Sequence, residues 1–366
     1  MKLELEHYKE AYFGCLHNRN VVNKKVGVTE KGFRIYFQSF GYALIVILKV
    51  ILSVFFKARS RKEIIFVSWG KLHTTLAKRL CLEPHVVVLN YALKKDQIAF
   101  FKNTSLLLAV KYASKIKLAG RDMDNGYDNV FFCFATIVEF QMLRNLVENA
   151  SHIYMAGQID RYAIMLSILA REGNKEFSFV QHGVNNVFEG LYRLKADNIY
   201  YLFGSSIPFF HSFLIGSENA KYFPIPSVKP NYKVDPRFKN AIGFASQILD
   251  SDLDILDIII ENYDCGEILI YPHPTEKSTK RFQKYADRRN VFLCREKVAN
   301  INYLISSGST LGMEYDLIGV PPVFINTLNI KSEIFLSKKF ISFPDLESFK
   351  EWFQKEVVKK DIVANN

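Results

Sequence analysis

Four hydroxyl side chains surround one glycine in residues 304–326, LISSGSTLGMEYDLIGVPPVFIN, between an apolar run and a helical pattern. They belong to Ser306, Ser307, Ser309 and Thr310. Backbone amides at the start of a helix bind phosphate well, and Gly308 would let the backbone come close to such a ligand. One hydroxyl is enough to cap a helix, so capping is the alternative interpretation. The stretch predicts a phosphate or nucleotide site, although the chain contains no GxxxxGKS or GxxxxGKT Walker segment.

A histidine between two prolines, in YPHPTEK at residues 271–277, follows another apolar run. Pro272 and Pro274 lack the N–H that a sheet ladder needs, so His273 is expected at the rigid end of a strand. From there its imidazole can donate to a phosphate or a leaving oxygen, and Lys277 adds positive charge. A turn histidine exposed by chance is the alternative. We expect His273 and the serine turn on neighbouring strands of one sheet, converging on one anion.

Three further residues are candidates for a general base that activates an acceptor hydroxyl. His182, in FVQHGVNN, ends an apolar run, and an imidazole with its ordinary pKa near 6.5 removes protons at neutral pH. A core histidine bonded to a backbone carbonyl is the alternative there. Asp124, in RDMDNGYD, also lies in a turn signal, and Asp160, in AGQIDRY, is equally a helix N-cap. Arg161, beside Asp160, would suit an acidic acceptor.

Two Asp-x-Asp pairs have a spacing at which carboxylates can share a divalent ion. They are Asp122 with Asp124 and Asp250 with Asp252. The second pair precedes an apolar helix, where the helix dipole favours acids in the first turn. A single phosphate can leave with the help of a histidine and helix-terminus amides. We therefore predict no required metal, and we expect no cofactor.

Short apolar runs that end in polar or glycine turns alternate with helical patterns along most of the chain. The expected strands are 62–69, 85–91, 129–135, 152–157, 177–183, 240–246, 267–274, 290–296, 299–308 and 321–326, and the expected helices include 161–173 and 252–263. Such alternation is typical of parallel sheets. The predicted fold class is α/β, with two Rossmann-like parallel-sheet domains facing a cleft, where ligands of such sheets bind.

The expected domain boundaries follow from this alternation and from a proline-rich segment. They divide the chain into a lead-in at 1–61, a first sheet domain at 62–221, a linker at 222–239, a second sheet domain at 240–345 and a C-terminal helix at 346–366.

The lead-in contains the apolar run YALIVILKVILSVFF at residues 42–56, which includes Lys49. It is shorter than the roughly 20 residues that span a bilayer. A basic cluster follows it, formed by Lys57, Arg59, Arg61 and Lys62. A buried helix, an interfacial helix with a basic flank and a true span all remain open. We expect peripheral contact with an anionic membrane.

Composition limits the classes of partner. The net charge of +11 favours anionic partners. The basic residues are spread along the chain without an aromatic-interleaved motif or helix-turn-helix spacing, so no nucleic-acid partner is expected. Aromatic residues make up 14% of the chain, which argues against extensive disorder. Five scattered cysteines, without a CxxC pair, argue against a disulfide framework or a zinc cluster and fit a reducing cytoplasm.

The C-terminal half resembles the donor-binding domain of a GT-B glycosyltransferase. The small-residue turn is followed by a helix that bears Glu314 and closes with Gly319-Val320-Pro321. YPHPTEK is similar to the His-Pro motif of bacterial sialyl-, polysialyl- and Kdo transferases, and the serine turn to their serine motif, in the same order. In those families both motifs bind the CMP of the donor. The donor site implied by the resemblance comprises His273, Pro274, Lys277, Ser306, Ser307, Gly308, Ser309, Thr310 and Glu314.

The first half carries a further resemblance. Gln181-His182-Gly183 is similar to a segment of capsule and teichoic-acid transferases in which the histidine serves as general base. Transferases that use CDP-glycerol also carry a motif similar to YPHPTEK. The acidic pair and following glycine of sialyltransferases have no match, because Asn125 separates Asp124 from Gly126.

The resemblance implies a metal-independent glycosyltransferase of capsule or lipooligosaccharide synthesis. It would move sialic acid or Kdo from a CMP-activated donor to a surface polysaccharide or lipooligosaccharide acceptor, at the inner face of the cytoplasmic membrane. Residues 62–221 would form the acceptor side and 240–345 the donor-binding domain. A polyol-phosphate transferase with a CDP-linked donor is the first alternative, before an NDP-hexose transferase. A non-catalytic GT-B-like sugar-binding protein stays open.

Overall fold

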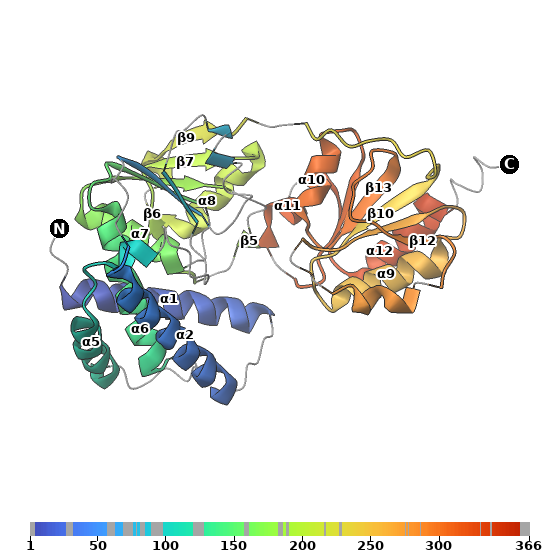
Figure 1. The fold of residues 1–366 in the computed structure, drawn as a ribbon. Coiled ribbons are helices and arrows are strands. Elements are labelled where there is room, and N and C mark those ends of the chain that lie inside the picture. Colours follow the sequence, from blue (N-terminus) through green and yellow to red (C-terminus); the bar gives the residue numbers. More distant parts are fainter. Residues whose placement is uncertain are drawn as a thin grey trace. The chain divides into compact units, whose positions relative to one another are not determined.

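The computed structural model divides the chain into two compact units (Figure 1). The first unit comprises Met1–His182 and Phe188–Pro226, and the second comprises Gly183–Val187 and Ser227–Asn366. The structure describes residues 4–26, 32–56, 63–68, 76–77, 79–80, 85–88, 98–119, 128–156, 161–181, 186–187, 190–215, 217–226, 229–274, 276, 278–285, 287–329, 331–336 and 339–358.

The first unit is built on a six-stranded sheet in which all neighbouring strands run parallel. Its strands are β1 (Ile64–Ser68), β2 (His85–Val88), β3 (His152–Ala156), β4 (Glu176–Val180), β7 (Asn198–Tyr201) and β9 (Lys221–Pro224). They lie in the order β2-β1-β3-β4-β7-β9. A short parallel pair is formed by β6 (Leu194–Lys195) and β8 (Leu214–Ile215). The first four strands were predicted from the sequence, whereas β7 and β9 were not.

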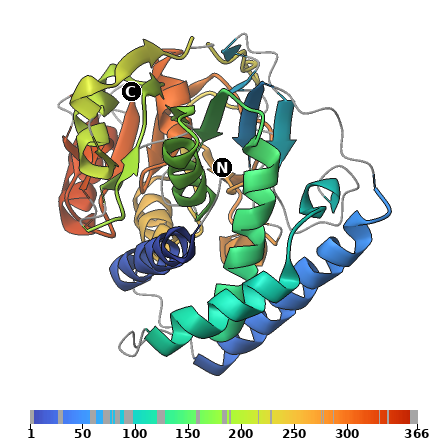
Figure 2. The ribbon, with the colours of Figure 1, turned by 90° about the vertical axis from the view of Figure 1, so that its left-hand side faces the viewer.

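Helices make up most of the rest of this unit. They are α1 (Leu5–Val26), α2 (Gly32–Ser53), α5 (Leu106–Ala119), α6 (Val130–Val147), α7 (Arg161–Glu172) and α8 (Ile207–Phe213). α2, α5 and α6 pack side by side, as Figure 2 shows. α1 and α2 come from the expected lead-in at 1–61, yet both contribute buried side chains to the core of this unit.

The prediction of a strand at 129–135 is wrong, because these residues begin α6. Asn129 caps the helix, and its side-chain oxygen accepts a hydrogen bond from the amide of Phe132 at 2.9 Å. α6 contacts α1, α2, α5 and α7. It is therefore buried on nearly every side, and its sequence lacks the polar face of a surface helix. A short apolar run without such a face cannot be assigned to strand or helix by periodicity.

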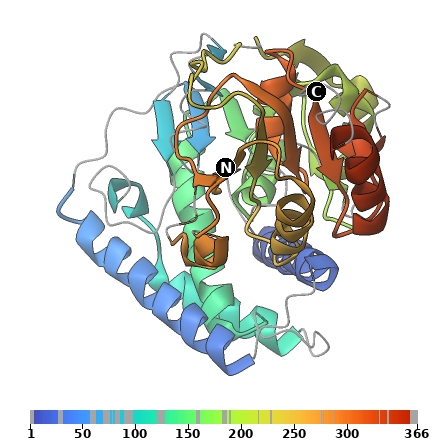
Figure 3. The ribbon, with the colours of Figure 1, turned by 90° about the vertical axis from the view of Figure 1, so that its right-hand side faces the viewer.

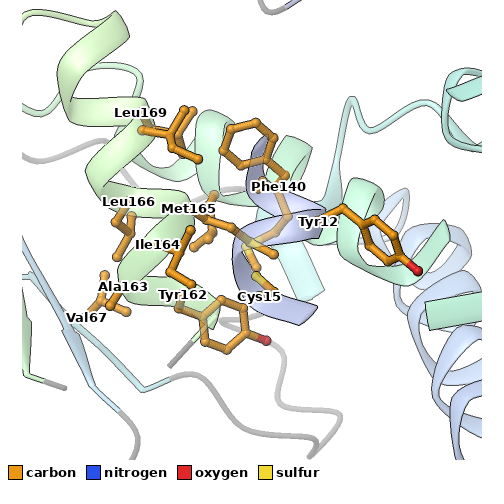
Figure 4. Close-up of a cluster of buried hydrophobic side chains, with 14 of the residues drawn as sticks. Tyr12, Cys15, Val67, Phe140, Tyr162, Ala163, Ile164, Met165, Leu166 and Leu169 are labelled. Carbon is orange, nitrogen blue, oxygen red and sulfur yellow. The ribbon is translucent and has the colours of Figure 1, made fainter. Parts of the chain in front are cut away.

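The core between helices and sheet is centred on α7. Figure 4 shows Cys15 of α1 and Phe140 of α6 near side chains of α7, which include Ile164 and Met165, while the ring of Tyr12 of α1 points away from α7. All of these side chains belong to one buried cluster, together with residues of β1, β3 and β4. α7 thus ties the helical layer to the sheet, and it fixes Arg161 at its own N-terminus.

The second unit has its own six-stranded parallel sheet. Its strands are β10 (Ala241–Ala245), β11 (Ile268–Tyr271), β12 (Val291–Leu293), β13 (Ile301–Ser306), β14 (Pro322–Ile325) and β16 (Ile341–Phe343). They lie in the order β12-β11-β10-β13-β14-β16. All but β16 were predicted from the sequence. Two Rossmann-like parallel-sheet domains are therefore confirmed.

Helices cover both faces of this sheet. They are α9 (Ser251–Asn262), α10 (Thr310–Asp316), α11 (Glu333–Leu336) and α12 (Leu346–Trp352), the last continuing as a π-helix over Phe353–Val358. Side chains of α9 and α12 share one cluster with Ile242 and Phe244, whereas Leu311 and Tyr315 of α10 share another with alternate strand residues. Because strand side chains alternate between faces, α9 and α12 (Figure 3) lie on one face and α10 on the other.

One strand of the second unit comes from an earlier part of the sequence. β5 (Asn186–Val187) pairs antiparallel with β15 (Lys331–Ser332). This pairing places the short segment Gly183–Val187 in the second unit, although the residues on both sides of the segment belong to the first.

Candidate active site

The order of strands in the second unit marks one position on its carboxyl edge. After β10, the next strands β11 and β12 are added on one side of the sheet. After β13, the strands β14 and β16 are added on the opposite side. β10 and β13 are therefore the neighbours at which the strand order reverses. Ligands of open α/β sheets bind outside the carboxyl ends of such a strand pair. The serine turn follows β13 directly, so it lies at this position.

The serine turn is held by its own hydroxyls. Ser306 Oγ accepts hydrogen bonds from the amides of Gly308 at 3.3 Å and Ser309 at 3.1 Å. Ser309 is the N-cap of α10, and its Oγ accepts from the amide of Leu311 at 3.2 Å. The capping interpretation therefore holds for Ser309. Gly308 has a φ of 127°, a conformation that favours glycine.

Ser307 connects the turn to a buried carboxylate. Its hydroxyl donates to Asp252 Oδ1 at 2.6 Å. The other carboxylate oxygen, Oδ2, accepts from the amides of Gln247 at 2.8 Å and Leu249 at 3.1 Å. Asp252 thus fixes the loop after β10 against the loop after β13. From the sequence, Asp252 was interpreted as a first-turn acid of a helix or as one half of an Asp-x-Asp pair, whereas its contacts lie with these two loops.

Asp252 also belongs to an ionic cluster that the sequence did not indicate. Arg281 lies 2.7 Å from Asp252 Oδ2 and 3.1 Å from Glu276 Oε1, and the side chains of both acids are almost completely buried. Ser246 donates toward both carboxylates, at 3.1 Å and 3.3 Å. Two carboxylates face one guanidinium, so this cluster holds the edge rigid but carries one formal negative charge in excess. Nothing in the local pattern singles out Glu276 or Arg281.

His273 lies two residues beyond the end of β11 and is partly buried. Its carbonyl accepts a hydrogen bond from the amide of Glu276 at 2.8 Å. The expectation that His273 and the serine turn stand on neighbouring strands is wrong, because β10 lies between β11 and β13. The two groups are about 10 Å apart along the same carboxyl edge, given the usual strand spacing. A ligand of nucleotide size would be needed to reach both.

The remaining predicted donor residues differ in their surroundings. Pro274 and Thr310 are exposed. Glu314, on α10, accepts a hydrogen bond from the hydroxyl of Tyr232. Burial, together with this bond, raises the pKa of Tyr232 well above its usual range. Lys277 lies outside the described residues.

The three candidate general bases also lie outside the described residues: His182, Asp160 and Asp124. Arg161, next to Asp160, begins α7 and pairs with the buried Glu139 at 2.9 Å. No group of three or more His, Cys, Asp or Glu side chains that could hold a metal occurs in the part of the chain that the structure describes.

No protein-family model matches the chain, and no curated protein matches it. Among solved structures, Anabaena HepE in complex with UDP-glucose is similar with a TM-score of 0.45 and 11% identity, over 89% of each chain. The wall teichoic acid polymerase TagF, H444N with CDPG, is similar with a TM-score of 0.40 and 10% identity, over 91% of each chain. The lipopolysaccharide outer core galactosyltransferase WaaB is similar with a TM-score of 0.41 and 10% identity, over 72% of this chain and 81% of WaaB. At these TM-scores the likenesses carry no argument about substrate or mechanism.

Proposed function

We propose that the chain is a glycosyltransferase that uses a CMP-activated acidic sugar, sialic acid or Kdo, and acts on a surface polysaccharide or lipooligosaccharide. The observation that carries the proposal is the serine turn at the strand-order reversal of the second unit. His273 stands on the same carboxyl edge, within the length of a nucleotide. A polyol-phosphate transferase with a CDP-linked donor would use the same two groups and is the second candidate.

Each group has a defined task in this proposal. His273 donates a hydrogen bond to the donor phosphate and to the departing oxygen. Gly308 and the exposed Thr310 bring the backbone and a hydroxyl to another part of the same nucleotide, about 10 Å away along the carboxyl edge. His182 removes the proton from the acceptor hydroxyl, with Asp160 and Asp124 as the other candidates. Turnover of radiolabelled CMP-sugars by the purified protein tests the activity, and absence of turnover with CMP-, CDP- and UDP-linked donors would leave only a binding protein.

Replacing His273 with alanine is expected to weaken CMP binding about ten- to a hundredfold. The variant loses a charge-assisted hydrogen bond, worth roughly 1.5–3 kcal/mol. Single replacements of serine-turn side chains should weaken CMP binding less than His273→Ala does, because the backbone amides of the turn remain. Calorimetry measures the affinities for CMP, CDP and UDP. The loss of affinity in the variant tests the site, and the comparison of the three nucleotides tests the donor class. Lys280→Ala, which changes an exposed cation at the start of the 3-10 helix Lys280–Tyr285, is the matched control. Equal affinities for CMP and UDP would overturn the CMP assignment.

We further propose that the protein works on the inner face of the cytoplasmic membrane, through α2. Two helices are long and apolar enough to cross a membrane by length and composition, Arg34–Ser53 and Val130–Val147. The second is 72% buried, as in a core helix, but the first is only 28% buried. The outer side of α2 and the turn after it carry large apolar side chains that are exposed to solvent: Phe37, Phe40, Leu44, Ile45, Leu48, Ile51 and Phe55.

This apolar face, defined by those seven residues, is the reverse of what a surface helix normally presents. The inner side of α2 buries Ile35, Ala43 and Val46 against its own unit, mostly against α6. A helix fixed on one side and apolar on the other fits the membrane interface better than a span. The basic cluster that follows it in sequence would suit anionic headgroups.

Replacing Leu44 and Leu48 with serine is expected to shift the protein from the membrane fraction to the soluble fraction. Both side chains are about half exposed, at 49% and 41%, so their loss removes apolar contact with lipid and little folding energy. Val234→Ser and Leu317→Ser alter exposed apolar residues elsewhere and serve as the control pair. An unaltered protein that is wholly soluble on cell fractionation would contradict the interfacial interpretation.

A further inference from the structure

Ile248 adopts a backbone conformation that isoleucine rarely takes. Its φ is 64°, in the left-handed region where a side chain branched at Cβ is crowded by its own backbone. Four described residues other than glycine have a positive φ, and the other three are asparagines: Asn103, Asn174 and Asn329. Asparagine tolerates this conformation, because its short polar side chain can bond locally. A turn that needed only this backbone shape would be expected to carry asparagine or glycine at residue 248 as well.

The loop around Ile248 is held by the ionic cluster. The amide of Ile248 donates to Ser246 Oγ at 3.2 Å. The amides on either side of it, those of Gln247 and Leu249, donate to Asp252 Oδ2 at 2.8 Å and 3.1 Å. Three successive amides of the loop are thus fixed by side chains of the same unit. A strained residue persists only where its surroundings determine its conformation in this way.

The side chain of Ile248 gains little from this arrangement within its own unit. It is 45% exposed. In the part of the chain that the structure describes, it belongs neither to the two buried clusters of the second unit nor to the partly buried side chains packed against them. Burial of apolar surface therefore does not offset the strain. Residues in such conformations cluster at ligand sites, where the strain serves binding.

Ile248 lies at the middle of the candidate site. It is in the loop that follows β10. β10 is the strand between β11, which leads to His273, and β13, which leads to the serine turn. With the usual strand spacing, β10 is about 5 Å from each of these two strands. A ligand that reaches from His273 to the serine turn must therefore pass over the loop that carries Ile248.

This middle position favours an uncharged flat group over a phosphate. The ionic cluster that holds the loop carries one formal negative charge in excess, which repels a phosphate. The amides of residues 247–249 already donate to Ser246 and Asp252. An exposed isoleucine side chain can instead cover the face of a ring and remove apolar surface from water. In a nucleotide, the flat uncharged ring is the nucleobase.

We propose that the nucleobase of the donor rests on Ile248, with the phosphate at His273 and the polar edge of the nucleobase toward the serine turn. The inference rests on the proposed function, since it assigns a contact to the nucleobase of the same donor. Ile248 is then a specificity-determining residue. It favours a nucleotide over a sugar phosphate, which would leave the isoleucine side chain in water.

Calorimetry on the full-length protein with CMP, and with ribose 5-phosphate, which lacks the nucleobase, tests the proposal. Ile248→Asn keeps the backbone conformation and removes the apolar contact. It is expected to weaken CMP binding about five- to tenfold, the effect of losing roughly half of the burial of an isoleucine side chain. Binding of ribose 5-phosphate should not change. Ile248→Val retains most of the contact and should bind CMP within about threefold of the unaltered protein.

Urea unfolding gives a second readout, which separates a ligand contact from a role in the fold. Because asparagine tolerates a positive φ, Ile248→Asn should unfold at the same urea concentration as the unaltered protein or at a higher one. Val234→Asn is the control, because it changes an exposed β-branched residue of the same unit and should leave CMP binding unchanged. A lower unfolding midpoint in Ile248→Asn would show that the isoleucine serves the fold, and it would overturn the proposal.

Two binding results would also overturn it. The first is an unchanged affinity for CMP in Ile248→Asn. The second is an equal loss of affinity for CMP and ribose 5-phosphate, which would show that the loop acts on the phosphate. Both results leave the proposed function standing as long as the unaltered protein binds CMP. An unaltered protein that does not bind CMP would instead remove the proposed donor, and this inference with it.

Discussion

Replacing His182 with alanine is expected to lower kcat by about 10²–10⁴, the usual contribution of one general base. The acceptor hydroxyl would then lose the group that takes its proton in the transition state. Affinity for the donor nucleotide should change little, because the predicted donor site lies in the second unit, after β11 and β13. Steady-state kinetics with a CMP-sugar and calorimetry with CMP measure the two quantities separately.

The control for this variant is His211→Ala, which changes an exposed histidine of α8 in the same unit. Near-normal turnover in His182→Ala would contradict the assignment. Asp160→Asn and Asp124→Asn would then be the variants to measure, and a fall of the same size in one of them would identify the base.

Replacing Asp252 with alanine is expected to destabilise the second unit by about 3–5 kcal/mol, the usual cost of removing one partner from a buried ion pair. The variant leaves Arg281 with one carboxylate fewer and leaves the amides of Gln247 and Leu249 without their acceptor. Since Ser307 also loses its acceptor, the serine turn should become less ordered. Nucleotide affinity is therefore expected to fall together with stability.

Urea unfolding, followed by the fluorescence of Trp352, measures this effect in the second unit. Trp352 packs against Phe343 with ring centroids 5.2 Å apart, and a Trp69→Phe background removes the other tryptophan of the chain. Asp254→Ala changes an exposed acid in the same helical turn and should move stability by less than about 0.5 kcal/mol. A loss below about 1 kcal/mol in Asp252→Ala would show that the ionic cluster does not hold this edge.

The strands of the second unit were predictable because their apolar runs are short and end in clear turn signals. Ile268–Tyr271 is bounded by Gly266 and Pro272, and Pro322–Ile325 by Pro321 and a polar turn. β16 was missed because its residues Ile341–Phe343 are few and only partly buried. α6 was misassigned because it is buried on nearly every side, which removes the polar face that identifies a helix.

The local structure around the candidate site was predictable where a motif is continuous in sequence and not where distant residues meet. The serine turn carries its signal within a few residues, and its place on the carboxyl edge follows from the strand before it. The contacts of Asp252 with Ser307 and Arg281 join residues far apart in the chain. Strand order is also a tertiary property, and the sequence therefore could not show that β10 separates His273 from the serine turn.

The pairing of β5 with β15 has a consequence for how the protein is made on the ribosome. Asn186–Val187 is synthesised long before its partner Lys331–Ser332. The two segments are 144 residues apart (331 − 187), so at about 5–20 residues per second β15 is made roughly 7–30 s after β5. During that time the first unit can fold, because it is formed by Met1–His182 and Phe188–Pro226. The segment between them, Gly183–Val187, belongs to the second unit and has to wait for its partner strand. The second unit cannot finish folding until β15 has been synthesised. A truncated product that ends before residue 331 would therefore leave β5 as an unpaired strand edge.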